Sequence, residues 1–169
     1  MLFRSMLAWQ LKANGQRVIV VASDNIPPAS RVAAGLFNPI TGKRLVLQSN
    51  ADTIIPAARV LYQSLETTLQ KSFFHEKPML RIIRDKSEGV AFEKRRKDPA
   101  YDEYLGNICP APKTLNSAHA MFEQRQTGYL DTNALLDALK EYFISENSFI
   151  SCQDRKSTRL NSSHITISY

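Results

Sequence analysis

The hydrophobic positions of this chain alternate between a helical and an extended spacing. Residues 6–14 carry apolar side chains four positions apart and end at Gly15, which predicts the last turns of a helix and its stop. Residues 17–22 form a mostly β-branched run, which predicts a buried strand. The strongest helical spacing in the chain covers residues 52–71.

The rest of the chain predicts shorter elements, and the final helix is the clearest of them. That helix begins at Asp131 or Thr132 and turns four apolar side chains inward: Leu135, Leu136, Leu139 and Phe143. The other expected elements are a turn at 41–42, an extended piece at 44–47, strands at 79–84, 120–126, 129–130 and 148–151, helices at 87–97 and 99–105, and a loop at 108–117. Helices that alternate with strands predict an α/β fold.

A segment of small residues follows the first strand. After two prolines the chain reads Ser-Arg-Val-Ala-Ala-Gly over residues 30–35, and a second turn follows at Asn38-Pro39. Small side chains let backbone N–H groups approach a flat or anionic ligand closely. In doubly wound sheets, a strand followed by such a loop is the usual place for a nucleotide cofactor. The segment is therefore a candidate nucleotide-binding loop.

Two segments of the chain resemble FAD-dependent oxidoreductases of the D-amino-acid oxidase and glycine oxidase type. In that family, a loop after the second strand ends in Ser/Thr-x-x-Ala-Ala-Gly, which matches Ser30, Ala33, Ala34 and Gly35. The second match is Gly-Tyr-Leu-Asp-Thr at residues 128–132, which is similar to the family's return from the substrate domain into the cofactor domain. The two matches occur in the family's order and together span most of the chain.

The resemblance implies an incomplete Rossmann-type FAD-binding domain with part of an α+β substrate domain. Residues 6–72 and 128–153 would belong to the cofactor domain, and residues 73–127 to the substrate domain. The residues expected along the cofactor's pyrophosphate and flavin ring are Ser30, Arg31, Ala33, Ala34, Gly35 and Leu36. By the same resemblance, Gly35→Val is expected to weaken FAD binding by crowding the ring.

The implied reaction is the oxidation of a small amine or amino acid. A hydride leaves the carbon that bears the amine and reaches flavin N5, and water hydrolyses the resulting imine. FAD carries this chemistry, and the protein binds and orients the reactants. The family's substrate-binding arginine and tyrosine come largely from later sequence, so no catalytic residue is named here. Whether oxygen or another electron acceptor reoxidises the flavin is left open.

The chain departs from the family pattern in two places. The Gly-x-Gly-x-x-Gly loop that binds the pyrophosphate should precede the helix at residues 6–14, and neither it nor the first strand is present. The family also places an acidic residue at the end of the second strand to bind the ribose. Ala22 occupies that position, and the nearest acid, Asp24, either replaces it or belongs to a turn.

Both ends of the chain are spelled like translated sequencing-library adapter. Residues 1–5 and 154–169 are therefore excluded from fold reasoning, and natural sequence is expected from about residue 6 to about residue 153. Residues 154–169 are expected to make no specific contribution to the core and to be extended, poorly packed or isolated, because a Ser-rich polar tail buries too little apolar surface. Residues 18–21 are expected to lack a neighbouring strand on one side, and the chain as given is not expected to retain FAD.

The charge of the chain gives no argument for a nucleic-acid partner. The net charge of +6 comes from 22 basic and 16 acidic residues; without the adapter-like ends these become 18 and 15, a net charge of +3, so nucleic acid is not indicated. The basic run at residues 94–97 is flanked by acids and reads as a solvated helix face.

The remaining residues that carry chemistry are sparse. Cys109 and Cys152 lie far apart, and His75 and His119 show no metal-ligand spacing, so no metal site is predicted and both histidines are interpreted as structural. No apolar run approaches the roughly 18 residues of a membrane span, and a cytoplasmic location is the default expectation.

Two other functions remain open. One is a non-enzymatic α/β module that binds a nucleotide, and the other is the flavin domain of a tRNA-modifying protein. A Gly-x-Gly-x-x-Gly sequence encoded upstream of Met6 would favour the flavoenzyme, and a salt-dependent affinity for tRNA would favour the RNA-associated protein.

Overall fold

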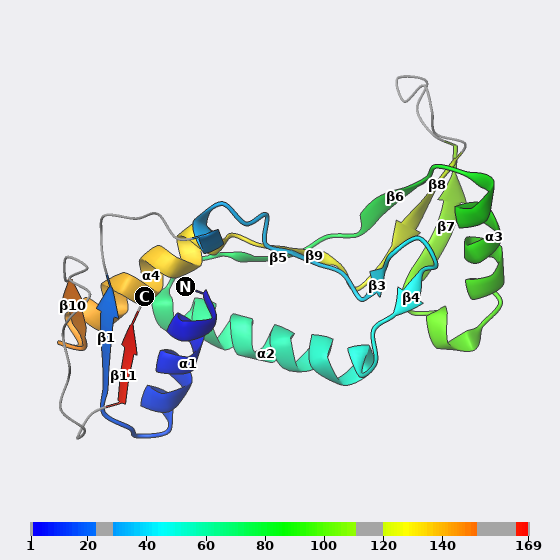
Figure 1. Ribbon diagram of the computed structural model, residues 1–169. Coiled ribbons are helices and arrows are strands. Elements are labelled where there is room, and N and C mark those ends of the chain that lie inside the picture. The colour runs from blue at the N-terminus through cyan, green and yellow to red at the C-terminus, as the bar shows by residue number, and fades with distance from the viewer. Residues whose placement is uncertain (1, 23–28, 111–119, 152–164, 169) are drawn as a thin grey trace. The chain divides into compact units, whose positions relative to one another are not determined.

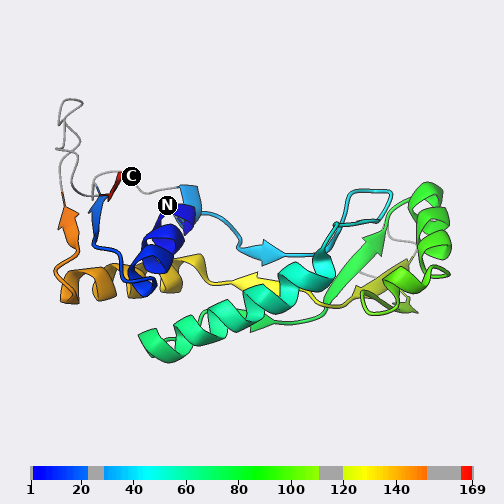
Figure 2. The same ribbon diagram turned by 90° about the horizontal axis from the view of Figure 1, so that it is seen from below.

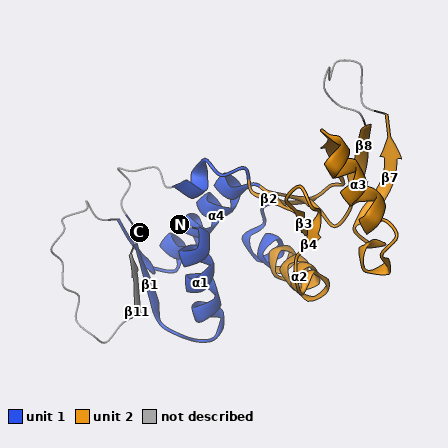
Figure 3. Ribbon diagram, turned by 45° about the vertical axis from the view of Figure 1, so that its right-hand side comes forward, with its two compact units in different colours: residues 1–34, 65–73, 131–169 blue, residues 35–64, 74–130 orange. Residues whose placement is uncertain are grey.

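The computed structural model describes residues 2–22, 29–110, 120–151 and 165–168 (Figure 1; Figure 2). The chain forms two compact units, which are coloured separately in Figure 3. Unit 1 contains residues 1–34, 65–73 and 131–169, and unit 2 contains residues 35–64 and 74–130. Both units combine helices with strands, which agrees with the α/β class predicted from the sequence.

Unit 1 is built on a short parallel sheet. Its elements are α1 (Leu2–Ala13), β1 (Val18–Ala22), the 3-10 turn η1 (Ala29–Arg31), α4 (Thr132–Ser145), β10 (Phe149–Ser151) and β11 (Ile165–Ser168). The strand order is β10-β1-β11, with both outer strands parallel to β1. Val18, Val20 and Ala22 of β1 are buried, whereas the alternate residues of the strand are only partly covered.

The pairing of β11 contradicts two expectations. Residues 165–168 do not lie apart from the fold, and β1 does not lack a neighbour, because Val18 to Val21 pair with Ile165 to Ser168. A strand with open N–H and C=O groups recruits another extended segment. The β-branched residues of Ile165-Thr166-Ile167 favour that conformation. The rest of the segment 154–169 lies outside the described residues.

The helices of unit 1 follow the predicted pattern with small changes at their ends. α1 runs from Leu2 to Ala13, so residues 6–13 are its last turns as predicted, and Gly15 follows its end with a positive φ of 76°. α4 has Asp131 as its N-cap, whose carboxylate accepts hydrogen bonds from the N–H groups of Asn133 and Ala134 at 3.1 and 3.0 Å. The four side chains predicted to face inward from this helix are all buried.

Unit 2 contains two three-stranded antiparallel sheets and a hairpin. One sheet has the order β2-β9-β5, formed by Leu36–Phe37, Gly128–Leu130 and Phe74–Glu76, and the other has the order β6-β8-β7, formed by Met79–Ile83, Ala120–Gln124 and Leu105–Cys109. The hairpin pairs β3 (Ile40–Thr41) with β4 (Val46–Leu47), and the helical elements are α2 (Ala51–Leu69), α3 (Lys86–Arg95) and η2 (Pro99–Tyr101). The last residues of α2, from Leu65 on, belong to unit 1.

Several predicted boundaries in unit 2 are wrong. β5 was not predicted, and β7 occupies residues expected to end a helix and begin a loop. α2 begins at Ala51, after Asn50 with a positive φ of 64°, rather than at an Asp52 or Thr53 cap. Both new strands depend on pairing with β8 or β9, which local sequence does not encode. The part of the predicted loop at residues 111–117 lies outside the described residues.

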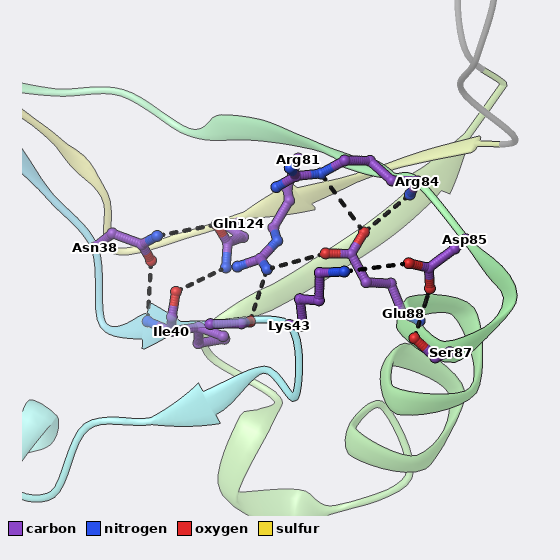
Figure 4. Close-up of polar contacts among 10 residues, drawn as sticks. Asn38, Ile40, Lys43, Arg81, Arg84, Asp85, Ser87, Glu88 and Gln124 are labelled. Carbon is purple, nitrogen blue, oxygen red and sulfur yellow. Dashed lines mark hydrogen bonds and ion pairs between the residues drawn. The ribbon is translucent and has the colours of Figure 1, made fainter.

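The core of unit 2 includes a buried carboxylate on α3 (Figure 4). Glu88 is 2% exposed, and its Oε2 accepts a hydrogen bond from the N–H of Arg84 at 2.9 Å. Its Oε1 makes no hydrogen bond among the described residues but lies 3.7 Å from Nη2 of Arg81. Arg81 also donates to the carbonyl of Gly42 at 2.7 Å. These contacts join α3, β6 and the turn of the β3–β4 hairpin.

Asp85, the N-cap of α3, has a strongly lowered pKa. Its carboxylate accepts hydrogen bonds from the Ser87 hydroxyl at 2.6 Å and the Glu88 N–H at 2.9 Å, and Lys43 lies 3.6 Å away. The Ser87 bond, followed by the Glu88 bond and the Lys43 charge, lowers the pKa of Asp85 from 3.8 to about 2. A carboxyl whose pKa is lower in the folded state stabilises that state above its unfolded pKa.

We expect the stabilising contribution of Asp85 to be complete above about pH 4 and to be lost as the pH falls through about 2. Ser87→Ala should raise the pKa of Asp85 towards 3.8 because it removes the largest cause of the shift. Lys43→Ala should raise it less. Carboxyl-detected NMR titration of the two variants tests this order, and an equal or larger shift in Lys43→Ala would contradict it.

Candidate functional site

The candidate nucleotide-binding loop is exposed and largely irregular. It begins in η1, continues without helix or strand through residues 32–35, and ends in β2. No long helix runs through the segment: Val32, Ala33, Ala34 and Leu36 are exposed, whereas Ser30, Arg31 and Gly35 are partly buried. Asp24, the alternative ribose-binding acid, lies outside the described residues. The division between the two units falls inside the segment, after Ala34.

In unit 1, the polar side chains of the loop are held by neighbouring helices. The Ser30 hydroxyl oxygen accepts a hydrogen bond from the N–H of Leu2 at 3.2 Å, which leaves its own O–H to donate. Arg31 pairs with Asp137 of α4 at 2.5 Å, and this hydrogen bond holds the pKa of Arg31 above its ordinary value. The guanidinium of Arg31 is thus held by α4.

The start of α4 also contacts the backbone of the loop. The Asn133 side-chain amide donates to the carbonyl of Arg31 at 3.0 Å, and the Thr132 hydroxyl donates to the carbonyl of Ala33 at 3.3 Å. The backbone N–H groups of exposed Ala33 and Ala34 have no acceptor among the described residues. Exposed N–H groups beside a serine hydroxyl are suitable donors to an anionic oxygen.

In unit 2, Gly35 fits its position only as a glycine. Its φ is +65°, and its carbonyl accepts a hydrogen bond from the N–H of Leu130 at 3.0 Å. A Cβ atom at this position would overlap the carbonyl oxygen of Leu130. The close approach of these two backbones therefore requires the absence of a side chain.

Leu36 shares one face of the β2-β9-β5 sheet with two aromatic residues. It pairs directly with Tyr129, which pairs in turn with His75, so all three side chains lie on the same face. The His75 and Tyr129 rings are 4.7 Å apart, and Leu36 is 65% exposed. This face offers a half-exposed apolar and aromatic surface to a flat ligand.

The opposite face of the same sheet is filled by protein. Phe74 stacks between Phe37 and Tyr62 of α2, with 5.2 Å between ring centroids in both pairs. Burial raises the pKa of Tyr62. The Phe37 ring also covers Gly128, where a Cβ atom would overlap the carbonyl oxygen of His75. Within the described part of the chain, the Leu36 face is therefore the side of this sheet that is open to a ligand.

Sequence reasoning found Leu36 but missed the two aromatic residues beside it. His75 was interpreted as structural, and Tyr129 was recognised only as part of a strand. Their position on the Leu36 face follows from the antiparallel register of β9 with β2 and β5. A visible alternation of polar and apolar residues would have predicted β5 and the face on which His75 lies. The three-residue strand is too short to show such an alternation.

Other candidate sites are not supported in the described part of the chain. No group of three or more His, Cys, Asp or Glu side chains there is arranged to hold a metal ion. In the basic run, Arg95 lies over the Tyr101 ring at 5.2 Å and Arg96 is 3.9 Å from Glu93. Among the helices described, none is long and apolar enough to cross a membrane.

No known protein-family model matches this chain. The resemblance to FAD-dependent oxidoreductases therefore depends on the two motif segments and on their placement.

Proposed function

We propose that this chain derives from an FAD-dependent oxidoreductase that oxidises a small amine or amino acid. One observation carries the proposal: the two segments on which the resemblance depends are neighbours in the fold. Leu36 of the first segment pairs with Tyr129 of the second, and the Leu130 N–H donates to Gly35. Two motif segments that belong to one binding site are expected to be neighbours in the fold, whereas two chance similarities are not.

Each unit contains residues that suit one of the two chemically distinct parts of the cofactor. In unit 1, the Ser30 hydroxyl and the N–H groups of Ala33 and Ala34 are donors suited to the pyrophosphate. In unit 2, Leu36 and Tyr129 present an apolar and aromatic surface suited to the flavin ring. When bound, FAD supplies the hydride acceptor for amine oxidation, and these residues bind and orient it.

The decisive experiment compares two exposed leucines of unit 2. Leu36 is 65% exposed and Leu80 of β6 is 59% exposed, so an aspartate at either position disturbs the fold to a similar extent. In the natural gene product that contains residues 6–153, Leu36→Asp should weaken FAD binding about tenfold or more, because it buries a carboxylate against the ring. Leu80→Asp should bind FAD like the parent protein. Quenching of flavin fluorescence on binding measures both.

The outcomes separate the competing functions. Equal FAD affinity in the two variants would show that Leu36 does not contact the cofactor. Absence of bound flavin in the parent protein would refute the proposal. Anaerobic bleaching of the bound flavin by glycine, sarcosine or D-alanine would support the amine oxidoreductase. Bound flavin that no amine reduces would favour the non-enzymatic nucleotide-binding module.

A further inference from the structure

An open hollow of about 520 Å³ lies in unit 2 at the start of α2. Its wall is formed by the segment from Leu47 to Asp52 and, across from it, by Pro99, Ala100, Glu103 and Tyr104. This volume lies within the ordinary range of small-molecule sites. None of these residues belongs to the candidate nucleotide-binding loop.

Two carboxylates of the hollow have no cationic partner. Asp52 and Glu103 are both exposed, and neither forms an ion pair within the described part of the chain. Among the described residues, the Asp52 side chain accepts one hydrogen bond, from the adjacent Thr53 hydroxyl at 3.4 Å. The two carboxylates therefore add negative charge to the hollow, although the N-terminal end of the α2 dipole offsets part of the charge of Asp52, which lies in the first turn of that helix.

Tyr104 adds a largely buried aromatic side chain whose hydroxyl has no protein hydrogen-bond partner in the described part of the chain. Its side chain lines the hollow, and the residue is 6% exposed. The nearby Tyr101 differs, because its hydroxyl donates to Leu45 at 2.9 Å and accepts from Leu47 at 3.1 Å. Burial, followed by the charges of Asp52 and Glu103, raises the pKa of Tyr104. A phenol oxygen close to two carboxylates can accept a hydrogen bond from a bound cation.

The chemistry of the wall favours an organic ammonium over a metal ion. Two carboxylates do not make a metal cage, and no group of three metal-ligating side chains occurs among the residues described. The hollow is far larger than a bare ion and also contains the apolar groups of Leu47, Pro99 and Ala100. A primary ammonium has three donors, one for each of the three oxygens, and its hydrocarbon chain fits the apolar part.

We propose that this hollow binds a primary alkylammonium group through Asp52, Glu103 and Tyr104. The inference goes beyond the proposed function and does not depend on it, since the site contains no residue of the flavin loop. An amine could reach it as a free small molecule or as a lysine side chain of another protein, and both present the same chemistry.

The test is an amide NMR titration of the 169-residue chain with n-butylammonium chloride at constant ionic strength. We expect saturable shifts confined to residues 47–52 and 99–104, with a dissociation constant on the order of 1–10 mM, because exposed ion pairs are weak. n-Butanol, which lacks the charge, should produce no saturable shift. Absence of saturation with the ammonium, or equal binding of the alcohol, would overturn the proposal.

Three variants locate the binding site. The double variant D52N/E103Q should weaken binding at least tenfold, and Tyr104→Phe, which removes only an unbonded hydroxyl, should weaken it about threefold. Asp102→Asn is the matched control, because Asp102 is exposed and adjacent in sequence but does not line the hollow. Loss of binding in the control equal to that in the double variant would contradict the assignment.

A second probe distinguishes the two sources of the amine. Tighter binding of Nα-acetyllysine methylamide than of n-butylammonium would identify a protein lysine as the ligand, and the reverse order would identify a free amine. Failure of both probes refutes this site without bearing on flavin binding, which the Leu36 and Leu80 variants measure separately.

Discussion

Replacing Gly35 with alanine is expected to destabilise unit 2 by about 2–5 kcal/mol. Two costs add at this position. The residue has a φ of +65°, where a side chain costs about 1–2 kcal/mol. A Cβ atom there would also overlap the carbonyl oxygen of Leu130, so the contact between Gly35 and β9 must open. Urea unfolding monitored by tyrosine circular dichroism, together with hydrogen exchange of the Leu130 amide, measures the effect.

Gly42 provides a matched control for this variant. Its φ of +66° is nearly the same, but no atom lies within 4 Å of a Cβ built on it. Gly42→Ala should therefore show only the conformational cost of about 1–2 kcal/mol and leave exchange of the Leu130 amide unchanged. Equal destabilisation by the two substitutions would show that the Leu130 contact is unimportant.

This comparison changes how Gly35 variants must be interpreted. From the family resemblance, a larger residue at position 35 is expected to weaken FAD binding by crowding the flavin ring. The structure supplies a second cause, because the same side chain also separates β2 from β9. Loss of flavin in Gly35→Val would thus not distinguish a cofactor contact from local unfolding. Leu36→Asp avoids this ambiguity because Leu36 is exposed.

The elements that sequence predicted best are those with a strong local pattern. The β-branched run became β1 within one residue of its expected start, and the amphipathic spacing after Asp131 became α4 with the expected buried face. In both cases, residues that are close in the chain determine the type and position of the element. Helix spacing, capping and β-branched propensity act over a few residues and are readable without knowing the fold.

Elements defined by distant partners were not predictable in the same way. β7 contains Gly106 and Asn107, which have low strand propensity, yet it pairs with β8. The register of β7 with β8 shifts between Leu105 and Ile108, and a Cβ atom at Gly106 would overlap the Glu123 side chain, so this irregularity of the pairing requires a glycine. β11 is a similar case, since its partner β1 lies near the other end of the chain.

The candidate site shows the same division between local and distant information. Ser30 to Leu36 were found because small residues form a recognisable run. The placement of His75 and Tyr129 beside Leu36 depends on the register of three short strands, and a shift of one residue would move each side chain to the opposite face. Sequence alone does not fix that register.

Replacing Phe122 with alanine is expected to have the largest effect on unit 2, a loss of about 3–5 kcal/mol in the free energy of unfolding. Phe122 is fully buried in the core formed with Ile40, Leu105 and Tyr101. Its ring centroid lies 4.5 Å from that of Phe92 on α3, so the truncation removes an apolar contact between this helix and the β6-β8-β7 sheet. The resulting cavity adds to the lost transfer energy because a packed core relaxes only partly.

The control is Val90→Ala on the same helix. Val90 is 70% exposed, and its truncation to alanine should change the free energy of unfolding by no more than about 0.5 kcal/mol.

Two measurements follow the two units separately. Trp9 is the chain's single tryptophan and lies in unit 1, so its fluorescence follows the unfolding of unit 1, while hydrogen exchange in β6 and β8 follows that of unit 2. Phe122→Ala should accelerate exchange in β6 and β8 at a urea concentration where Val90→Ala does not. Equal exchange rates in the two variants would mean that the Phe92–Phe122 pair does not hold α3 against the sheet.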